Sequence, residues 1–212
     1  NSENMRKFKV LIPDADCGHA LAVAKALAKK NVEVHSMSAD CNVALKFSRF
    51  NKSFIQIPSF FEKENEALNV IINTSIKKDI DLILPIDEPT HLFFSRNKTK
   101  VCNQIKLAPI SSIDILQIAT NKWNLHKFCV ANNIPVPKSQ LLELSNNNIP
   151  EWLNFPIIIK PDKGHGGHLI QKLSSLKEYN EFRRKDHDRR LGNLFVQEYI
   201  NGYDIDMSIL SE

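Results

Sequence analysis

The sequence has few glycines, no clustered cysteines and no long apolar run. Its four cysteines, Cys17, Cys41, Cys102 and Cys129, are far apart, without a Cys-x-x-Cys pair or histidines at metal-ligand spacing. This spacing argues against a zinc site and against a disulfide framework. No stretch of about 18 apolar residues could span a bilayer, and no signal-peptide hydrophobic region is visible. We therefore expect a soluble, cytoplasmic protein with no membrane partner.

A basic surface for nucleic acid is also missing. The formal net charge is +4, and the one local basic run, Arg183–Lys185 with Arg189 and Arg190, is interrupted by Asp186 and Asp188. No aromatic residues interleave these charges, as a stacking surface for bases would need. This run is typical of a solvated helix end, so we expect no nucleic-acid partner.

The first half of the chain alternates short apolar runs with amphipathic stretches. At 212 residues and 42% hydrophobic content, the chain is long enough for two small domains. The alternation predicts βαβ units and a parallel, Rossmann-like α/β sheet over residues 1–110. The expected strands are Phe8–Pro13, Val32–Met37, Phe54–Ile57, Leu82–Ile86 and Gln104–Ala108, and the expected helices are His19–Lys30 and Glu62–Lys78.

The character of the sequence changes after residue 110. Two helices are expected at Ser111–Thr120 and Lys122–Asn132, and Pro135 and Pro137 end the helical stretch. This region, 111–143, reads as a helical connection. Residues 144–212 begin with an asparagine-rich linker and predict a small α+β subdomain with antiparallel strands. Its expected strands are Phe155–Lys160, His168–Lys172, Leu194–Glu198 and Asp204–Leu210, with a helix at Ser174–Asp186.

The turn after the first strand argues against a dinucleotide site. A G-x-G-x-x-G fingerprint needs three glycines, whereas Pro13–His19 holds only Gly18. Asp14 and Asp16 would also repel a pyrophosphate at the following helix N-terminus. We therefore expect no NAD or FAD binding in the first domain.

The most informative stretch is a lysine at the end of an apolar strand, followed by a glycine-rich turn. Lys160 ends Ile157-Ile158-Ile159, and Gly164, Gly166 and Gly167 follow with Lys163, His165 and His168 beside them. Glycines let the backbone approach an anion closely and turn its N–H groups inward. The loop lacks the Walker A pattern, and strands flank it, which is typical of a phosphate flap. A snorkelling lysine beside a plain flexible hairpin is the alternative.

A second candidate stretch ends the strand Leu194–Glu198. Glu198 is followed by Tyr199, Ile200, Gly202 and Asp204. A carboxylate beside extended backbone can accept from an exocyclic amine or from ribose hydroxyls, while apolar neighbours sandwich a base. A strand–turn–strand hairpin with exposed acids is the alternative.

Together these motifs resemble the nucleotide-binding half of the ATP-grasp superfamily. The resemblance rests on Lys160-Pro161, the glycine-rich loop, and Gln197–Ile200 with Gly202 and Asp204. The stretch from Lys122 to Asn133-Ile134-Pro135-Val136-Pro137 is similar to the preceding helix of that family, where glycine is usual in place of Asn133. Asparagine also tolerates the left-handed conformation. Residues 8–110 are similar to the pre-ATP-grasp domain, with closest likeness to carbamoyl-phosphate-synthase-like ligases.

The resemblance implies a role for each matching position. Lys122 and Lys160 would contact the ATP phosphates, with Lys160 also near the adenine. The loop of Gly164, His165, Gly166, Gly167 and His168 would be the mobile phosphate flap. Glu198 would mark the adenine edge, and the backbone of Gln197, Tyr199 and Ile200 would line the adenine pocket. Asp204 would lie near the ribose.

The resemblance also implies what the chain lacks. In this family the Mg²⁺ ligands lie on the second ATP-grasp subdomain, beyond the position matched by Glu212, so no metal ligand is expected here. Without magnesium, phosphoryl transfer from ATP loses its main electrostatic stabilisation. We therefore expect the front part of an ATP-dependent ligase, inactive alone, from a truncated or split protein.

The implied reaction joins a small-molecule carboxylate to an amine through an acylphosphate, and a homodimer is compatible with it. Asp87, Glu88 and His91 follow a predicted strand at the carboxyl end of the sheet, where open α/β folds bind ligands, so they are candidate acceptor residues. A helix N-terminus with acids in its first turn is the alternative explanation. A non-catalytic nucleotide-binding module completed by another chain is the alternative function.

Overall fold

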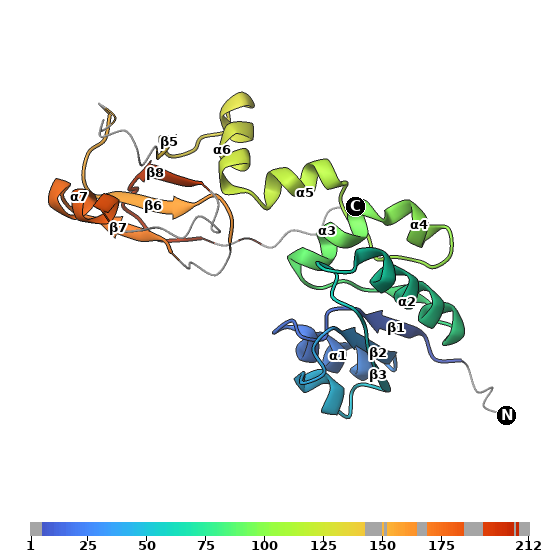
Figure 1. Ribbon diagram of the computed structural model, residues 1–212. Coiled ribbons are helices and arrows are strands. Elements are labelled where there is room, and N and C mark those ends of the chain that lie inside the picture. The colour runs from blue at the N-terminus through green and yellow to red at the C-terminus, as the bar shows by residue number, and fades with distance from the viewer. Residues whose placement is uncertain are drawn as a thin grey trace. The chain divides into compact units, whose positions relative to one another are not determined.

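The computed structural model describes residues 6–142, 150, 152–164, 169–184, 193–205 and 207. The chain divides between Leu116 and Gln117 into two compact units, unit 1 and unit 2. Figure 1 shows the elements of both. The predicted domain boundaries at residues 110 and 143 remain predictions. Among the described residues, no helix is both long and apolar enough to cross a membrane.

Unit 1 is built on a parallel sheet, as predicted. Its four described strands are β1 (Lys9–Ile12), β2 (Glu33–Ser38), β3 (Ser53–Gln56) and β4 (Leu82–Ile83), in the order β3-β2-β1-β4. Every neighbouring pair is parallel. All four strands therefore end at the same edge of the sheet, where the loops that follow them gather.

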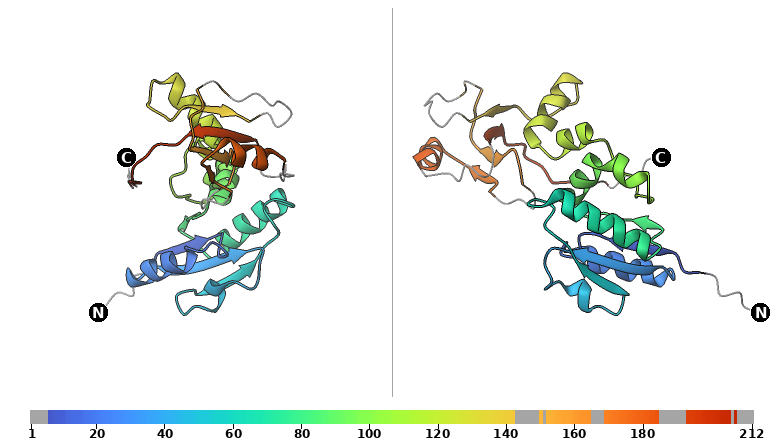
Figure 2. Two further views of the ribbon diagram at one scale, coloured as in Figure 1. Left: turned by 90° about the vertical axis from the view of Figure 1, so that its left-hand side faces the viewer. Right: turned by 45° about the vertical axis from the view of Figure 1, so that its right-hand side comes forward.

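Helices cover both faces of this sheet, and the alternation of β1 shows why. Val10 and Ile12 are buried with α1 (Ala20–Lys29) and the 3-10 turn η1 (Ala44–Phe47). Leu11, which points to the opposite face, is buried with α2 (Glu64–Lys77), α3 (Glu88–Arg96) and α4 (Lys98–Cys102). Figure 2 shows α1 and α2 on opposite sides of the strands. A strand buried on both faces needs the continuous apolar run that β1 has.

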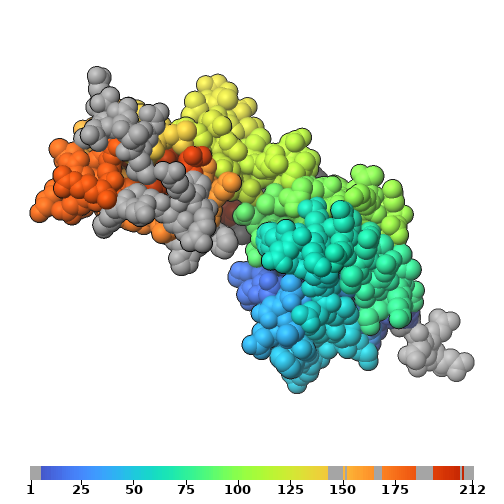
Figure 3. All heavy atoms as spheres, viewed as in Figure 1, coloured from blue at the N-terminus to red at the C-terminus, as the bar shows by residue number. Residues whose placement is uncertain are grey.

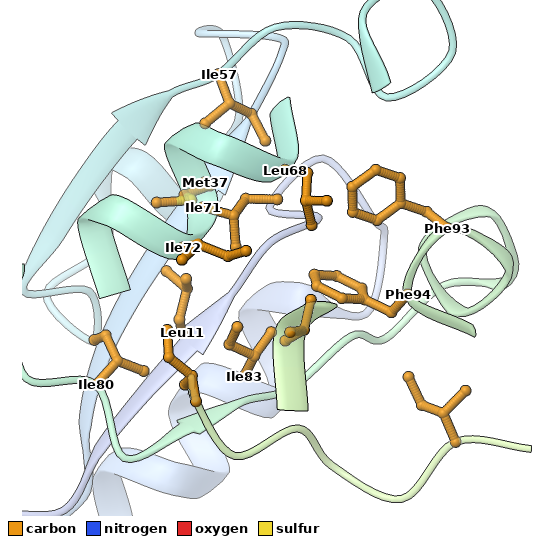
Figure 4. Close-up of a cluster of buried hydrophobic side chains, with 13 residues drawn as sticks. Leu11, Met37, Ile57, Leu68, Ile71, Ile72, Ile80, Ile83, Phe93 and Phe94 are labelled. Carbon is orange, nitrogen blue, oxygen red and sulfur yellow. The ribbon is translucent and has the colours of Figure 1, made fainter. Parts of the chain in front are cut away.

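The larger of the two cores in unit 1 lies between the sheet and α2 to α4. Figure 4 shows Leu11 and Ile83 of the sheet facing Leu68 and Ile71 of α2. Phe93 is fully buried there, and its ring lies 4.7 Å from that of Phe60 and 5.0 Å from that of Phe94, between ring centroids. Aromatic packing thus joins α3 to the segment between β3 and α2, within the core that it shares with the sheet.

Unit 1 departs from the prediction at its far edge. The strand expected at Gln104–Ala108 is wrong, because only one parallel bridge, Ile83 to Leu107, forms there. The expected strand Leu82–Ile86 is shortened to β4 because Asp14 binds the backbone N–H groups of Ile86 and Asp87. Helix α4 and the turn η1 were not predicted, and α3 was expected only as the alternative explanation of Asp87 and Glu88. Their sequences carry polar residues on several sides and give a weak periodic signal.

Unit 2 carries an antiparallel sheet, also as predicted. Its strands in the described residues are β5 (Ser139–Leu141), β6 (Ile157–Pro161), β7 (Gln171–Leu173) and β8 (Leu194–Glu198), in the order β5-β8-β6-β7. All pairs are antiparallel. Helix α7 (Leu176–Arg184) and helix α6 (Lys122–Ala131) belong to this unit, and α5 (Ile113–Ala119) crosses the division between the units. Strand β5 was not predicted.

The two faces of this second sheet have different partners. Ile157 and Ile159 of β6 are buried with Tyr179 and Phe182 of α7. Because successive side chains alternate, Lys160 lies on the other face, where Phe195 is its cross-strand partner. Trp123 of α6 contacts the Phe195 ring, at 5.6 Å between centroids, so α6 covers the Lys160 face. The atoms of α6 appear in yellow in the space-filling view (Figure 3).

Two further predictions in unit 2 have clear outcomes. Asn133, which stands where the resembling family has glycine, adopts φ 56° and so takes the left-handed conformation expected of it. The strand expected at Asp204–Leu210 is wrong for its described residues, Asp204, Ile205 and Met207, which belong to no strand. The rest of that segment lies outside the described residues.

The aromatic core of unit 1 gives a stability prediction. Phe93→Ala removes a fully buried ring, and we expect it to lower the free energy of unfolding by about 3–5 kcal/mol through lost transfer energy and a residual cavity. Urea denaturation followed by circular dichroism measures this change. Phe61→Ala, at a ring that is 81% exposed, is the matched control and should cost less than about 0.5 kcal/mol. Equal losses for the two variants would contradict the assignment of Phe93 to the core.

A candidate anion-binding site on the antiparallel sheet

Lys160 is a half-buried cation at the end of a strand whose neighbours are apolar. Its ammonium nitrogen lies 5.2 Å from the centroid of the Phe195 ring, which is a favourable cation–π position. Burial lowers the pKa of Lys160, and the charge of Lys122 lowers it further. Both effects disfavour the charged form, so an anion placed near Lys160 would relieve them.

Lys122 approaches the same place from α6. Asn121 caps that helix by accepting from the N–H of Asn124 at 2.8 Å. The N–H of Lys122 donates to the carbonyl of Asp162 at 2.8 Å, and its ammonium donates to the carbonyl of Gly164. Helix α6 is thereby attached to the chain just after Lys160. The predicted phosphate lysines, 38 positions apart in sequence, come together in the fold.

No described carboxylate lies within ion-pair distance of Lys122 or Lys160. Two neighbouring ammonium groups repel each other, and a half-buried cation normally has a partner. Gly164, which begins the glycine-rich loop, adopts φ +100°, a conformation that other residues rarely adopt. Two cations that have no carboxylate partner among the described residues, beside this turn, form an arrangement that can hold a polyanion.

Asp162 fixes the start of the loop, a role the sequence did not reveal. This buried carboxylate accepts from the backbone N–H of Asn193 at 3.1 Å and from its side-chain amide at 3.2 Å. The N–H of Asp162 donates in turn to the carbonyl of Asn193 at 2.8 Å. The end of β6 is thus joined to the beginning of β8. Sequence could not show this, because the partners are 31 positions apart.

Glu198 and Gln197 lie at the other end of β8, beside β5. The Oε1 atom of Glu198 accepts from the N–H of Lys138 at 2.7 Å, and the N–H of Glu198 donates to the carbonyl of Lys138 at 2.9 Å. The amide of Gln197 donates to the Ser139 hydroxyl at 2.9 Å. These contacts hold the strand end in place. The adenine-pocket role of both residues remains a prediction.

The remaining predicted nucleotide residues differ in their surroundings. The Tyr199 ring carries the Lys172 ammonium at 3.7 Å from its centroid, whereas Ile200 and Asp204 are exposed. His165, Gly166, Gly167 and His168, the central part of the predicted flap, lie outside the described residues. No group of three or more histidine, cysteine, aspartate or glutamate side chains in the described ranges could hold a metal ion.

In unit 1, Asp14 organises the carboxyl edge of the parallel sheet. Its Oδ2 atom accepts from the N–H groups of Ile86 and Asp87 at 2.8 and 2.7 Å, and from the Thr90 hydroxyl at 2.5 Å. Its Oδ1 atom is buried without a hydrogen-bond partner among the described atoms. Burial raises the pKa of Asp14 despite these hydrogen bonds. The carboxyl expected only to repel a pyrophosphate instead joins the loop after β1 to the loop after β4.

The candidate acceptor residues lie at the N-terminus of α3. Asp87 is its N-cap and accepts from the N–H of Glu88 at 2.9 Å, and the Nδ1 atom of His91 donates to the carbonyl of Asp87 at 2.8 Å. These contacts give Asp87 and His91 a capping role that needs no ligand. Their acceptor role, like that of Glu88, remains a prediction.

A hollow of about 280 Å³ opens at the same edge of the sheet. The loops after β1 and β2 line it, with Asp16, Cys17, Asp40 and Asn42 among its residues. The hydroxyl of Ser38 donates to Asp16 at 2.8 Å across these loops. Burial raises the pKa of the Cys17 thiol, and nearby carboxylates reinforce this, so the thiol is not activated as a nucleophile.

Sequence comparisons bear on this geometry. No protein-family model matches the chain. It is 26% identical over 164 residues to alpha-aminoadipate–LysW ligase LysX of Saccharolobus solfataricus, covering 69% of this chain and 59% of that protein. It is 21% identical over 140 residues to a carbamoyl-phosphate synthase of Methanobrevibacter smithii, covering 64% of this chain and 36% of that protein.

Solved structures extend the likeness to nearly the whole chain. The L-amino acid ligase from Bacillus licheniformis matches with a TM-score of 0.65 at 17% identity, over 94% of this chain and 46% of that one. Over the matched span, the chain therefore shares its fold with part of an ATP-grasp ligase. A biotin carboxylase from Campylobacter jejuni, solved as a complex with beta-gamma-ATP, matches with a TM-score of 0.63 at 16% identity, over 93% of this chain and 46% of that one.

These matches confirm the predicted resemblance to ATP-grasp ligases, including the carbamoyl-phosphate-synthase-like group. They also set its extent. The chain spans between 36% and 59% of the curated relatives it matches, and about half of the solved ligase and carboxylase chains. The likeness to ATP-grasp ligases therefore covers only a part of each relative, and about half of each solved chain.

The raised pKa of Asp14 gives a prediction about stability and pH. The folded state keeps this proton to a higher pH than the unfolded state, so the stability it provides is complete at low pH and lost as pH rises through the folded pKa. The free energy of unfolding of the parent, relative to Asp14→Asn, should therefore fall as pH rises above about 4, the ordinary pKa of an aspartate. Denaturant titrations at several pH values measure this difference.

The exposed Asp114 provides the control, because Asp114→Asn removes the same charge without a buried carboxyl. Its stability difference from the parent should change much less over the same range. A relative stability of the parent that rises with pH would show that Asp14 is stabilised as a carboxylate, contrary to this account.

Proposed function

We propose that the chain binds the polyphosphate of ATP between Lys122, Lys160 and the loop from Gly164 to His168. The observation that carries this proposal is the pair of neighbouring lysines for which no described carboxylate is a partner. ATP would bring the missing negative charge. The fold that the chain shares with part of an ATP-grasp ligase, and the nucleotide complexes among its structural neighbours, support this assignment.

The adenine side of the proposed site lies at the end of β8. Glu198 is held by Lys138 and would present its free carboxylate oxygen toward the adenine amine, beside backbone groups of Gln197, Tyr199 and Ile200. Asp204 would lie near the ribose. A pocket of this kind fixes the base by a few hydrogen bonds between apolar walls.

The activity we propose for the whole protein is ATP-dependent ligation of a carboxylate to an amine. ATP phosphorylates the carboxylate, and the amine displaces the phosphate from the acylphosphate. The sequence relatives include a ligase and a carbamoyl-phosphate synthase, which supports this reaction class. The residues described here would bind and orient the polyphosphate. We propose that Mg²⁺ ligands belong to the part of the relatives that these 212 residues do not span.

The acceptor is proposed to be a small-molecule carboxylate in a cytoplasmic pathway, with Asp87, Glu88 and His91 as contacting residues. These residues follow β4 at the carboxyl edge of the parallel sheet, where open α/β folds bind ligands. The domain assignment proposed with this function keeps residues 1–110 as the pre-ATP-grasp domain, 111–143 as a helical connection and 144–212 as an ATP-grasp subdomain. A homodimer is compatible with it.

Removing one phosphate lysine tests the proposed nucleotide site. Lys160→Ala should weaken ATP binding at least about tenfold, because a charge-assisted contact contributes about 1.5–3 kcal/mol. Isothermal calorimetry with ATP measures the affinity. Lys127→Ala, an exposed lysine on the same helix as Lys122, is the matched control and should bind like the parent. Equal affinities for parent and Lys160→Ala would remove Lys160 from the site.

Comparing the 212-residue chain with a longer form of the protein separates ATP binding from catalysis. The 212-residue chain should bind ATP without hydrolysing it. A longer form, which includes the region of the relatives that these 212 residues do not match, should release phosphate when Mg²⁺ and a carboxylate acceptor are supplied. A phosphate-release assay on both forms measures this. If the longer form binds ATP but releases no phosphate, either with or without a carboxylate acceptor, the protein is better explained as a non-catalytic nucleotide-binding module.

A further inference from the structure

His126 lies one helical turn after Lys122 and belongs to the same face of α6. Its ring stacks on Trp123, with 5.1 Å between centroids and 17° between planes. Trp123 in turn contacts Phe195, over whose ring the Lys160 ammonium lies. Two aromatic rings, those of Trp123 and Phe195, thus connect the histidine to Lys160 across the face of the sheet.

The Nδ1 atom of His126 is buried and has no hydrogen-bond partner in the described part of the chain. A neutral imidazole offers one donor and one acceptor nitrogen, and leaving either unpaired away from water is costly. The stacking on Trp123 holds the ring in the position where Nδ1 lacks a partner among the described residues. A ligand that formed a hydrogen bond with Nδ1 would regain this free energy.

The charges around His126 are positive. Lys160 from β6 acts on the ring, Lys122 lies on the same helix, and β8 contributes the uncharged Phe195. Burial lowers the pKa of His126, and the charge of Lys160 lowers it further. The ring is therefore neutral near pH 7 while the site is empty of anions. A bound polyphosphate would reverse the sign of the local potential.

We propose that His126 is a third ligand of the polyphosphate, and that it takes up a proton from solvent when the anion binds. This inference rests on the phosphate site proposed above. The protonated ring donates from Nδ1, the nitrogen that now lacks a partner, to a phosphate oxygen. The positive charge needed to hold the anion is thus completed only when the anion arrives, so the empty site carries less repulsion between Lys122, Lys160 and His126.

A packing role is the competing explanation, since the ring also fills space against Trp123. The two explanations differ in pH dependence. A packing residue affects affinity by the same factor at every pH. A ligand that takes up a proton contributes fully below its pKa in the free protein, and its contribution disappears as pH rises through its pKa in the complex.

The first measurement is the pKa of His126 itself, by NMR of the imidazole ¹⁵N signals in the 212-residue chain, with and without inorganic tripolyphosphate. We expect the anion to raise this pKa by about one unit or more, as a close opposite charge does. His19, an exposed histidine in unit 1 whose side chain makes no cap hydrogen bond, is the internal control, and the anion should leave its signals unchanged. An unchanged His126 pKa in the presence of bound tripolyphosphate overturns the inference.

The second measurement compares tripolyphosphate affinities of the parent and His126→Gln. The parent should bind about tenfold more tightly near pH 5.5, and the ratio should approach one near pH 8. Protons on the tripolyphosphate itself cancel in this ratio. His19→Gln should match the parent throughout. A ratio that does not change with pH identifies a packing role and overturns the proposal.

The same experiments with ATP separate this inference from the nucleotide assignment. If ATP binds and the His126 pKa stays fixed, the inference fails while the nucleotide site stands. If tripolyphosphate binds with the expected shift and ATP does not bind, the nucleotide assignment fails and His126 remains an anion ligand. Binding of neither probe overturns both.

Discussion

The register of β6 against β8 determines which side chains lie on each face of the sheet in unit 2. Lys160 opposes Phe195, while Ile159 opposes Val196 beneath α7. A slip of one residue would exchange the two faces, burying the ammonium among the apolar side chains under α7 and exposing isoleucines where we propose the anion site. The apolar core under α7 therefore determines the position of a charged group that does not touch it.

Asp162 and Asn193 fix this register at the end of the strand pair that is next to Lys160. Their three mutual hydrogen bonds join the last residues of β6 to the first of β8, and the adjoining carbonyl of Asp162 accepts from Lys122. Strand, helix and glycine-rich turn are consequently fixed by neighbouring backbone groups. The side chains left over include two lysines without a carboxylate partner among the described residues, and a histidine whose Nδ1 atom has no hydrogen-bond partner there. A site of this kind is preorganised for an anion at the expense of its own electrostatic stability.

Much of this arrangement was predictable from sequence, and the reasons are local. The apolar runs of β1, β2, β6 and β8 gave their strands, and Lys160 with the glycines gave the phosphate hypothesis. What escaped prediction depends on contacts distant in sequence. From sequence, Asp14 is only an acid in a turn, and its role appears once Ile86 and Thr90 are seen to donate to it. Asp162 is likewise only a loop residue until its contacts with Asn193 are known. His126 carries no motif, because its surroundings are supplied by other elements.

The stacking of Trp123 between His126 and Phe195 has an optical consequence. The chain has two tryptophans, Trp123 and Trp152, and both belong to unit 2. A protonated imidazole stacked on an indole quenches its fluorescence by accepting an excited electron, whereas a neutral imidazole quenches far less. Trp123 thus lies against a ring that we propose to gain a proton when the anion binds, so its emission intensity would record, without a label, when an anion enters and leaves.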